Sequence, residues 1–386
     1  MKTDPQRVMI YVQHLLGIGH LNRSLLLAGP LQQQGFDVSL VSGGMPQPKT
    51  RLHDFKIYQL DPVRSKDDRF TALVNSDGDE VDDDWKMRRK QQLLDLFAEV
   101  APDALITETF PFGRRMMRFE LIPLLDACRS SLKQMTVIAS IRDILQPKSR
   151  PERNVEICQL IQQYYDHVLV HGDASVATLE DSFSLAAQIS DKVSYSGYIC
   201  NSQPAAAPPA TPGIEVIVSA GGSATGLAIL KAAVGAKPLS LLRDARWRIM
   251  VSPAIAERDY LELKKSSSAT LLIERNRADF TSLISTARLS ISQAGYNTVT
   301  DLLQTDTPAI IIPFAAADEQ EQTIRSRCLQ QAGRVAVIAE TDLNAERLAT
   351  TIDQVSTARQ QPFPVQLDGA RQSANLIQTW LNQSDA

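Results

Sequence analysis

The sequence has few cysteines, few aromatic residues and almost no excess of charge. Its four cysteines, Cys128, Cys158, Cys200 and Cys328, form no CxxC pair and no cysteine–histidine spacing typical of zinc. A disulfide framework and a structural zinc site are therefore not expected, which fits a reducing compartment. The net charge of −4 gives no bulk attraction for nucleic acid, so no nucleic-acid partner is expected.

Long hydrophobic runs are also missing. No apolar run approaches the roughly 20 residues that a membrane helix needs. The amino end, MKTDPQRVMIYVQ, has no signal-peptide core, because a charged residue interrupts it before the first apolar run. We therefore expect a cytoplasmic protein, for which a peripheral contact with the inner face of the membrane stays open.

The chain alternates between apolar strand-like runs and amphipathic helical stretches. At 386 residues it is longer than one usual core, so two domains are expected. The alternation predicts two Rossmann-like α/β domains with parallel sheets, at residues 1–200 and 214–366. Between them, residues 201–213 have the Pro/Ala composition of a semi-rigid linker, and residues 367–386 predict a final helix.

A histidine follows the first glycine turn. Residues 7–16, RVMIYVQHLL, predict a strand that leads into Gly17, Gly19 and a helix. His20 follows, and an imidazole with an ordinary pKa of about 6.5 can accept a proton from an incoming hydroxyl near neutral pH. The structural alternative is a helix-capping or core histidine.

Glu108 ends a predicted strand, residues 102–108, at the same sheet edge as His20. It is expected either to orient the imidazole or to be a hydrogen-bonded structural carboxylate. Arg23, one helical turn after His20, is expected to contact a phosphate or to pair with a carboxylate. His20 and Glu108 are therefore the candidate catalytic pair.

The second half has a glycine-rich turn after its first predicted strand. Residues 219–226, SAGGSATG, offer small side chains and free N–H groups at a helix start, which suits a diphosphate. The alternative is a plain tight turn.

A second turn follows the predicted buried strand at residues 289–293. There Asn297 and Thr298 are expected to cap the next helix, whose N–H groups attract an anion such as phosphate. Asp301, one turn further on, can accept bonds from two neighbouring hydroxyls, as on a ribose. The apolar run at residues 309–314 predicts the next strand. It is followed by Asp318, Glu319 and Gln320.

This arrangement resembles the donor-binding region of GT-B glycosyltransferases, especially the bacterial family that adds N-acetylglucosamine to lipid-linked peptidoglycan precursor. The matching residues are Gly295, Thr298, Asp301, Pro313, Asp318 and Gln320. The family usually has Glu at the position of Asp301. Separately, Gly17–Arg23 resembles the GxGHxxR signature of a nucleotide-sugar hydrolase in the nonulosonic-acid pathway.

The resemblance implies the GT-B fold, in which two Rossmann-like domains face each other across a cleft and the last helix packs back on the first domain. It further implies an inverting, metal-independent transfer from a nucleotide-diphosphate sugar, a UDP-sugar, to an acceptor hydroxyl. The first domain would bind the acceptor, lipid-linked or membrane-proximal, with His20 as general base. No cofactor is expected. The implied donor-binding residues are Gly17, Gly19, Ser219, Gly221, Gly222, Ser223, Gly295, Asn297, Thr298, Asp301, Asp318, Glu319 and Gln320.

Three other functions stay open. A hydrolase of the same fold would use His20 to activate water, and an epimerase would also need carboxylates beside the sugar ring. A module that binds nucleotide sugars without catalysis is the third.

Two polar segments have double interpretations. Residues 61–90 are rich in charge and predict a solvated loop that runs into a helix, or else a mobile flap over the acceptor. Residues 110–119, FPFGRRMMRF, predict the start of a helix with one packed face, or else a contact for an anionic lipid or polar acceptor.

Overall fold

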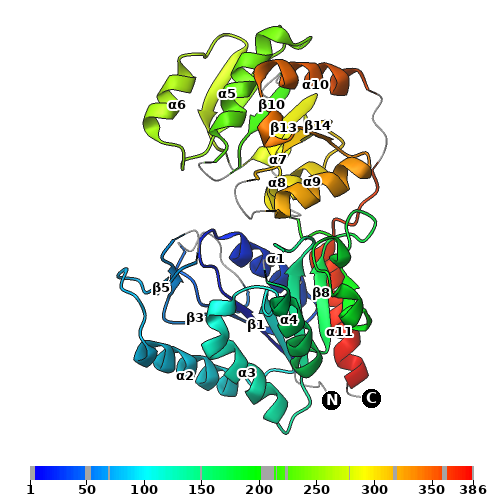
Figure 1. Cartoon of the computed structure of the whole chain (residues 1–386). Helices are drawn as coiled ribbons and strands as arrows, with labels where there is room; N and C mark the ends of the chain where they lie inside the picture. Colours follow the sequence, from blue (N-terminus) through cyan, green and yellow to red (C-terminus); the bar gives the residue numbers. More distant parts are fainter. Residues whose placement is uncertain are drawn as a thin grey trace. The chain divides into compact units, whose positions relative to one another are not determined.

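The chain divides into two compact units (Figure 1). The first comprises Met1–Ala174, Phe183–Ile199 and Asp368–Ala386, and the second comprises Ser175–Ser182 and Cys200–Leu367. The computed structural model describes residues 5–47, 54–67, 70–147, 150–200, 213, 215–221, 225–277, 279–315, 320–358 and 363–384. The predicted linker, residues 201–213, lies outside the described residues except for Gly213.

The first unit is built on a parallel sheet, seven-stranded in the described part of the chain. In spatial order its strands are β3 (Lys56–Gln59), β2 (Asp37–Ser42), β1 (Arg7–Val12), β6 (Ala104–Glu108), β7 (Thr136–Arg142), β8 (His167–His171) and β9 (Val193–Tyr195). The strand order therefore reverses between β1 and β6. The sequence did not predict β3, because its residues KIYQ form a mostly exposed edge strand without an apolar run.

Helices cover both faces of this sheet. On one face, α1 (Gly19–Gln33) and α11 (Gly369–Ser384) lie side by side and share a core with Val8, Ile10 and Val12 of β1. On the other face, Tyr11 of β1 donates to Glu120 of α3 (Arg118–Ser130). Alternate strand residues point to opposite faces, which explains this division. The remaining helices are α2 (Asp83–Val100) and α4 (Pro151–Tyr164).

The final helix has the predicted apolar face. Ala374, Ile377, Trp380 and Leu381 are all buried at helical spacing. The Trp380 ring stacks on His167 of β8 with the ring centroids 3.9 Å apart. Apolar burial and stacking therefore attach the end of the chain to the first unit.

The second unit repeats the strand order of the first. Within the described residues its parallel strands are β12 (Leu271–Arg275), β11 (Trp247–Val251), β10 (Val216–Ser219), β13 (Leu289–Gln293), β14 (Ala309–Ile312) and β15 (Ala336–Val337), in spatial order. Its helices are α5 (Leu227–Ala236), α6 (Glu257–Lys264), α7 (Phe280–Ser285), α8 (Tyr296–Leu303), α9 (Glu321–Gln331) and α10 (Ala345–Thr357). Here the order reverses between β10 and β13. Open parallel sheets bind ligands at the carboxyl ends of the strands beside such a reversal.

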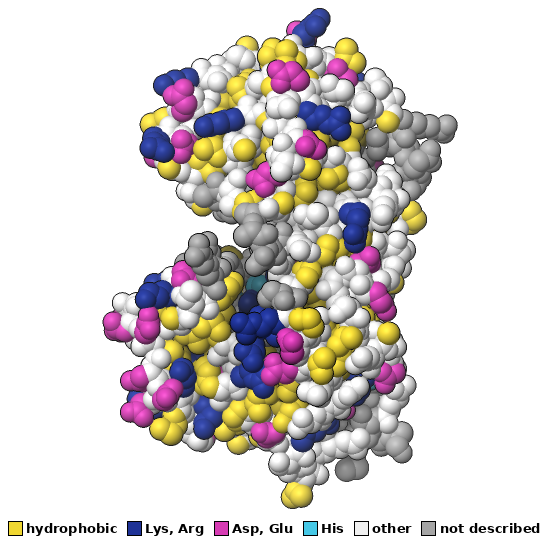
Figure 2. All heavy atoms as spheres, viewed as in Figure 1, with side chains coloured by type: hydrophobic (Ala, Val, Ile, Leu, Met, Phe, Trp, Pro, Cys, Tyr) yellow, Lys and Arg dark blue, Asp and Glu magenta, His cyan; other side chains and the backbone are white. Residues whose placement is uncertain are grey.

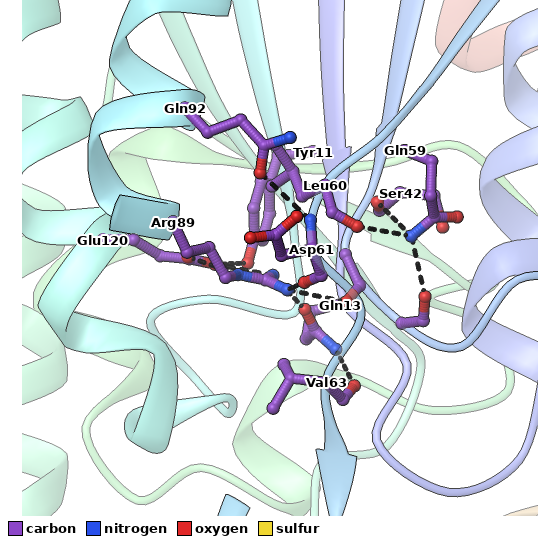
Figure 3. A network of polar contacts seen from close by, with 12 residues as sticks. Tyr11, Gln13, Ser42, Gln59, Leu60, Asp61, Val63, Arg89, Gln92 and Glu120 are labelled. Atoms are coloured by element: carbon purple, nitrogen blue, oxygen red, sulfur yellow. Dashed lines mark hydrogen bonds and ion pairs between the residues drawn. The ribbon is translucent and has the colours of Figure 1, made fainter. Parts of the chain in front are cut away.

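A buried arginine on α2 ties the loops of the first unit together (Figure 3). Arg89 is fully buried, and its Nε donates to Glu120 at 2.7 Å. The same guanidinium donates to the side chain of Gln13 at 2.7 Å, to the carbonyl of Gly43 at 2.9 Å and to the carbonyl of Asp61. One cation therefore holds the loops after β1, β2 and β3.

The segment at residues 61–90 is largely exposed and runs into α2 as predicted, but Val63, Ser65, Leu73 and Val74 are buried. It contains a short hairpin, β4 (Arg64–Ser65) and β5 (Leu73–Val74), whose apolar residues are buried. The side chain of Gln13 donates to the carbonyl of Val63 at 3.0 Å and so pins the start of the hairpin. The many charged residues of this segment gave no sign that the hairpin is buried. They also gave no sign that Arg89 lies on the buried face of α2 with Leu93 and Leu96.

Candidate active site

The reversal in the first sheet brings His20 and Glu108 together. Strand β1 leads through Gly17 into α1, so His20 lies in the first turn of that helix. Glu108 is the last residue of β6, the strand paired with β1. His20 Nδ1 lies 2.7 Å from Glu108 Oε1.

The shorter contacts of the imidazole indicate its tautomer, because Nδ1 lies closer to Glu108, at 2.7 Å, than to the Arg23 NH2 group, at 3.4 Å. Arg142, the last residue of β7, places its NH2 3.2 Å from His20 Nε2. A guanidinium has only N–H donors, so Nε2 accepts this bond. The hydrogen of the neutral ring is then on Nδ1, which donates to Glu108. This is the arrangement in which a carboxylate orients a histidine base.

Burial keeps the imidazole neutral and the carboxylate ionised. Burial, reinforced by Arg114 and Arg142 against the attraction of Glu108, lowers the pKa of His20 to about 3. Burial alone would raise the pKa of Glu108, but His20 and Arg23 outweigh it and hold that pKa well below its usual range. We attribute the ionisation of Glu108 at neutral pH chiefly to Arg23, because the neutral imidazole contributes only its hydrogen bond.

Arg23 pairs with the carboxylate, one of the two contacts expected for it. Its buried guanidinium forms a salt bridge with Glu108 Oε1. The hydroxyl of Thr109 donates to the same oxygen at 2.7 Å. Glu108 is thus fixed from three sides and can hold the ring of His20 in one orientation.

The loop after β6 contains two strained residues beside this cluster. Thr109 and Arg114 have φ angles of 66° and 59°, in the left-handed region that residues with a β-carbon rarely adopt. The Nε of Arg114 donates to the carbonyl of Gln13 at 2.6 Å. This bond places the Arg114 guanidinium near Glu108, where it contributes to the lowered pKa values of His20 and Glu108.

Three residues of this cluster were not predicted as site residues. Thr109 and Arg114 belong to or adjoin the stretch FPFGRRMMRF, in which Phe110 and Phe112 turn out to be core residues. Arg142 ends the apolar run of β7. A charged residue at the carboxyl end of a buried parallel strand is the signal that could have identified it.

In the second unit, polar side chains hold the turn that follows β10. The hydroxyl of Ser219 accepts from the backbone N–H of Gly221 at 3.3 Å, and Asn276 donates to the carbonyl of Gly221 at 3.0 Å. Gln293, at the end of β13, donates to the hydroxyl of Thr225 at 3.2 Å. Gly221 has φ 73°, which requires glycine. Gly222 and Ser223 lie outside the described residues.

The capping role predicted for Asn297 and Thr298 is wrong. Helix α8 begins at Tyr296, so Gly295 holds the cap position. Asn297 is exposed and Thr298 is buried, and both lie within the first turn. Because glycine has no side chain to cap a helix, the first amides of α8 are left to other partners.

Asp301 lies partly buried in α8. Its carboxylate accepts from Thr281 of α7 at 2.8 Å. Burial raises the pKa of Asp301 to about 6, although the bond from Thr281 opposes the shift. This carboxylate is therefore close to titrating near neutral pH.

The start of α9 is tied to the turn before α8. Arg325 is buried and donates to Glu321 at 2.8 Å and to the carbonyl of Ala294 at 3.4 Å. Gln320 is the exposed residue immediately before α9. Asp318 and Glu319 lie outside the described residues.

The described residues lack two features that the chemistry of such a site could use. They contain no group of three or more His, Cys, Asp or Glu side chains placed to hold a metal ion. They also contain no helix long and apolar enough to cross a membrane.

Comparison with known proteins finds a family model that resembles the second half of the chain. Residues 216–379 match the family model described as "Glycosyltransferase family 28 C-terminal domain". Among curated proteins, the chain is 32% identical over 106 residues to a UDP-N-acetylglucosamine–N-acetylmuramyl-(pentapeptide) pyrophosphoryl-undecaprenol N-acetylglucosamine transferase of Gloeobacter violaceus, covering 25% of this chain and 29% of the relative. It is 31% identical over 119 residues to the enzyme of that name from Anaeromyxobacter, covering 30% of this chain and 31% of the relative. The chain thus matches less than a third of the length of either relative.

Solved structures match both units. The glycotransferase of kitacinnamycin has a TM-score of 0.64 at 14% identity and covers 98% of this chain and 99% of its own. Acinetobacter baumannii MurG has a TM-score of 0.62 at 16% identity, over 97% and 100% of the two chains. The spinosyn rhamnosyltransferase SpnG complexed with thymidine diphosphate has a TM-score of 0.60 at 13% identity, over 98% and 96%. The protein therefore has the predicted GT-B fold of two Rossmann-like α/β domains, and residues 216–379 resemble the C-terminal domain of glycosyltransferase family 28.

Proposed function

We propose that the protein is an inverting glycosyltransferase that moves a sugar from a nucleotide-diphosphate donor to an acceptor hydroxyl. The observation that carries this proposal is the neutral His20, whose Nδ1 is held 2.7 Å from Glu108 at the carboxyl edge of the first sheet. It stands in a chain whose second unit matches a glycosyltransferase domain. A neutral imidazole oriented by a carboxylate is suited to take a proton from a hydroxyl.

In the proposed reaction, His20 Nε2 accepts the proton of the acceptor hydroxyl. The hydroxyl oxygen forms a bond to the anomeric carbon, and the bond from that carbon to the diphosphate oxygen breaks. One displacement of this kind inverts the anomeric centre. Glu108, ionised and bonded to Nδ1, stabilises the imidazolium that forms.

The second unit supplies fixed donors for the leaving diphosphate. Helices α5 and α8 begin after Gly226 and Gly295, which have no side chains to cap their first amides. Exposed amides and the helix dipole favour a diphosphate at such positions without a metal ion. We assign the ribose hydroxyls to Asp301 and the sugar to Asp318, Glu319 and Gln320. The names of the curated relatives favour UDP as the nucleotide.

The acceptor belongs to the first unit in this proposal. On the face shown in Figure 2, Lys and Arg side chains gather next to a histidine of that unit. In the same unit, Arg115 and Arg118 carry exposed and half-exposed guanidinium groups that pair with Glu156. The relatives' names describe a pyrophosphoryl-undecaprenol acceptor, so we propose a lipid-linked acceptor at the cytoplasmic face of the membrane.

The test is incubation with a panel of nucleotide sugars, with and without candidate acceptors. We expect a glycosylated acceptor and free nucleotide only when both substrates are present, and no product from His20→Ala. Free nucleotide at the same rate without acceptor would identify a hydrolase, and an altered sugar an epimerase. Donor binding without any product would identify a non-catalytic module.

A further inference from the structure

The nitrogen proposed to take the acceptor's proton is in contact with a guanidinium. Arg142 NH2 lies 3.2 Å from His20 Nε2, and this contact uses the lone pair of that nitrogen. The other ring nitrogen is bonded to Glu108 at 2.7 Å. A neutral imidazole has one in-plane lone pair, so Arg142 and a substrate hydroxyl compete for the same position.

The arginines around His20 differ in how deeply they are buried. Arg23 is buried and forms a salt bridge with Glu108, so it is fixed in the cluster. Arg142 has its backbone held in β7, but its side chain is only partly buried. A long side chain that reaches the surface can leave His20 by rotating about its own bonds, without a change in the fold.

We propose that Arg142 masks the catalytic base, and that a hydrogen-bond-accepting oxygen of the acceptor draws the guanidinium away and thereby frees Nε2. This inference rests on the proposed glycosyltransferase function. It assigns Arg142 a positioning role that favours transfer over hydrolysis. Solvent water already competes with the contact between Arg142 and His20, whereas an anionic oxygen of the acceptor binds a guanidinium more strongly than water does.

The side reaction that the mask suppresses is attack by water. A freed Nε2 would take a proton from water, and the water oxygen would form a bond to the anomeric carbon. The bond to the diphosphate would break, and the products would be the free sugar and the nucleoside diphosphate. Masking the base would prevent the loss of donor in this reaction.

The first experiment measures the mask without any enzymatic assay. Diethyl pyrocarbonate modifies a neutral imidazole through its free lone pair, and mass spectrometry of peptides gives the rate at His20. We expect Arg142→Ala to raise that rate about tenfold, a part of the roughly 10²–10⁴ that a positioned base supplies in catalysis. Arg142→Lys keeps a cation at this position, so His20 should be modified at an intermediate rate. This variant provides a second test in case the alanine variant fails to fold.

The matched control is Arg129→Ala. Arg129 lies at the end of α3, where it donates to the carbonyl of Tyr164 and pairs with Asp166 just before β8, at the opposite edge of the sheet. The modification rate of His20 should stay unchanged in this variant. An unchanged rate in Arg142→Ala as well would overturn the proposed mask.

The second experiment measures nucleotide release from a UDP-sugar without acceptor. We expect Arg142→Ala to raise this hydrolysis about tenfold and to raise the ratio of hydrolysis to transfer by at least as much. Faster modification of His20 without faster hydrolysis would overturn the protection against water. If Arg142→Ala speeds the modification of His20 but the protein transfers no sugar, the proposed function is rejected while the masking of His20 by Arg142 stands. Failure of the proposed function can thus be told apart from failure of the proposed mask.

Discussion

The two units have the same strand order but present different groups where that order reverses. In the first unit, ionisable side chains meet there, with His20 between Glu108 and Arg142. In the second unit, the corresponding turns offer glycines and helix amides, with Asp301 further along α8. A moving proton needs a group that titrates, whereas a diphosphate is best held by donors that do not. In the proposed reaction, one topology would thus serve two kinds of chemistry, which illustrates why fold alone does not assign function.

Burial acts in opposite directions on the two titrating groups. It is the largest cause of both shifts: it lowers the pKa of His20 to about 3 and raises that of Asp301 to about 6. His20 is therefore in its basic, neutral form at any pH above about 3. Asp301 loses its charge as the pH falls through about 6. A fall in pH should consequently affect the second unit before the first.

The largest expected effect comes from removing the base. His20→Ala should lower kcat by about 10²–10⁴, the usual range for a general base, because no other group in the cluster is a neutral proton acceptor placed by Glu108. Donor affinity should change little, since the proposed diphosphate contacts are backbone amides of the second unit. Steady-state kinetics and donor titration would separate the two quantities.

Glu108→Gln sharpens this prediction. It keeps a hydrogen-bond acceptor for Nδ1–H but removes the charge that stabilises the imidazolium, so we expect a smaller loss of kcat than in His20→Ala.

The kcat of the unaltered protein should show no decline assignable to His20 between pH 8 and about 4, because the pKa of His20 lies near 3. An active His20→Ala protein would reduce His20 to a structural residue.

The next largest effect concerns the donor. Asp301→Asn should weaken nucleotide-sugar binding by about 1.5–3 kcal/mol, the usual contribution of hydrogen bonds to a charged group. In the unaltered protein, the dissociation constant should rise as the pH falls through about 6, because protonation removes the same charge. Calorimetry at pH 5, 6 and 7 would show this dependence, and Asp301→Asn should abolish it. A variant that binds as tightly as the unaltered protein would remove Asp301 from the donor site.

The sequence predicted the features that follow from local patterns. Continuous apolar runs identified most of the buried parallel strands, and the spacing of Ala374, Ile377, Trp380 and Leu381 identified the buried face of α11. Adjacent βα turns then placed His20 and Glu108 at one sheet edge, and the structure has the two side chains in contact. Alternation and strand order are properties of short stretches, so one sequence is enough to recognise them.

The features that the sequence did not predict depend on contacts between distant residues. Arg89 lies in a charged segment, yet it is buried because Glu120, Gln13 and two backbone carbonyls satisfy it together. Arg142 reaches His20 from a residue 122 positions away. Such partners depend on which distant strands, helices and loops lie side by side in the fold, and local residue patterns do not specify that arrangement.

A substitution at Gly43 tests how much the stability of the first unit depends on the hydrogen bonds of Arg89. A β-carbon on Gly43 would lie 2.2 Å from Gln13 Oε1 and 2.3 Å from Arg89 NH2, much closer than van der Waals contact. We therefore expect Gly43→Ala to lower the free energy of unfolding by about 1–3 kcal/mol, the usual cost of overpacking. Urea unfolding followed by tryptophan fluorescence would measure it.

Gly29→Ala is the matched control for this experiment. Gly29 lies inside α1, and a β-carbon there would meet nothing within 4 Å. Alanine is favoured over glycine inside a helix, so this variant should gain about 0.5–1 kcal/mol. Equal stability of the two variants would show that the packing around Gly43 relaxes and that the network tolerates the change.

The smallest expected effect separates the sugar from the nucleotide within the second unit. Gln320 is exposed at the start of α9, and a neutral amide contributes about 0.5–1.5 kcal/mol through one hydrogen bond. Gln320→Ala should therefore weaken binding of the nucleotide sugar by about that amount and leave binding of the free nucleoside diphosphate unchanged, because the amides that would hold the diphosphate are not altered. Parallel titrations with the nucleotide sugar and with the nucleoside diphosphate give the comparison. An equal loss of affinity for both ligands would show that Gln320 contacts the nucleotide and not the sugar.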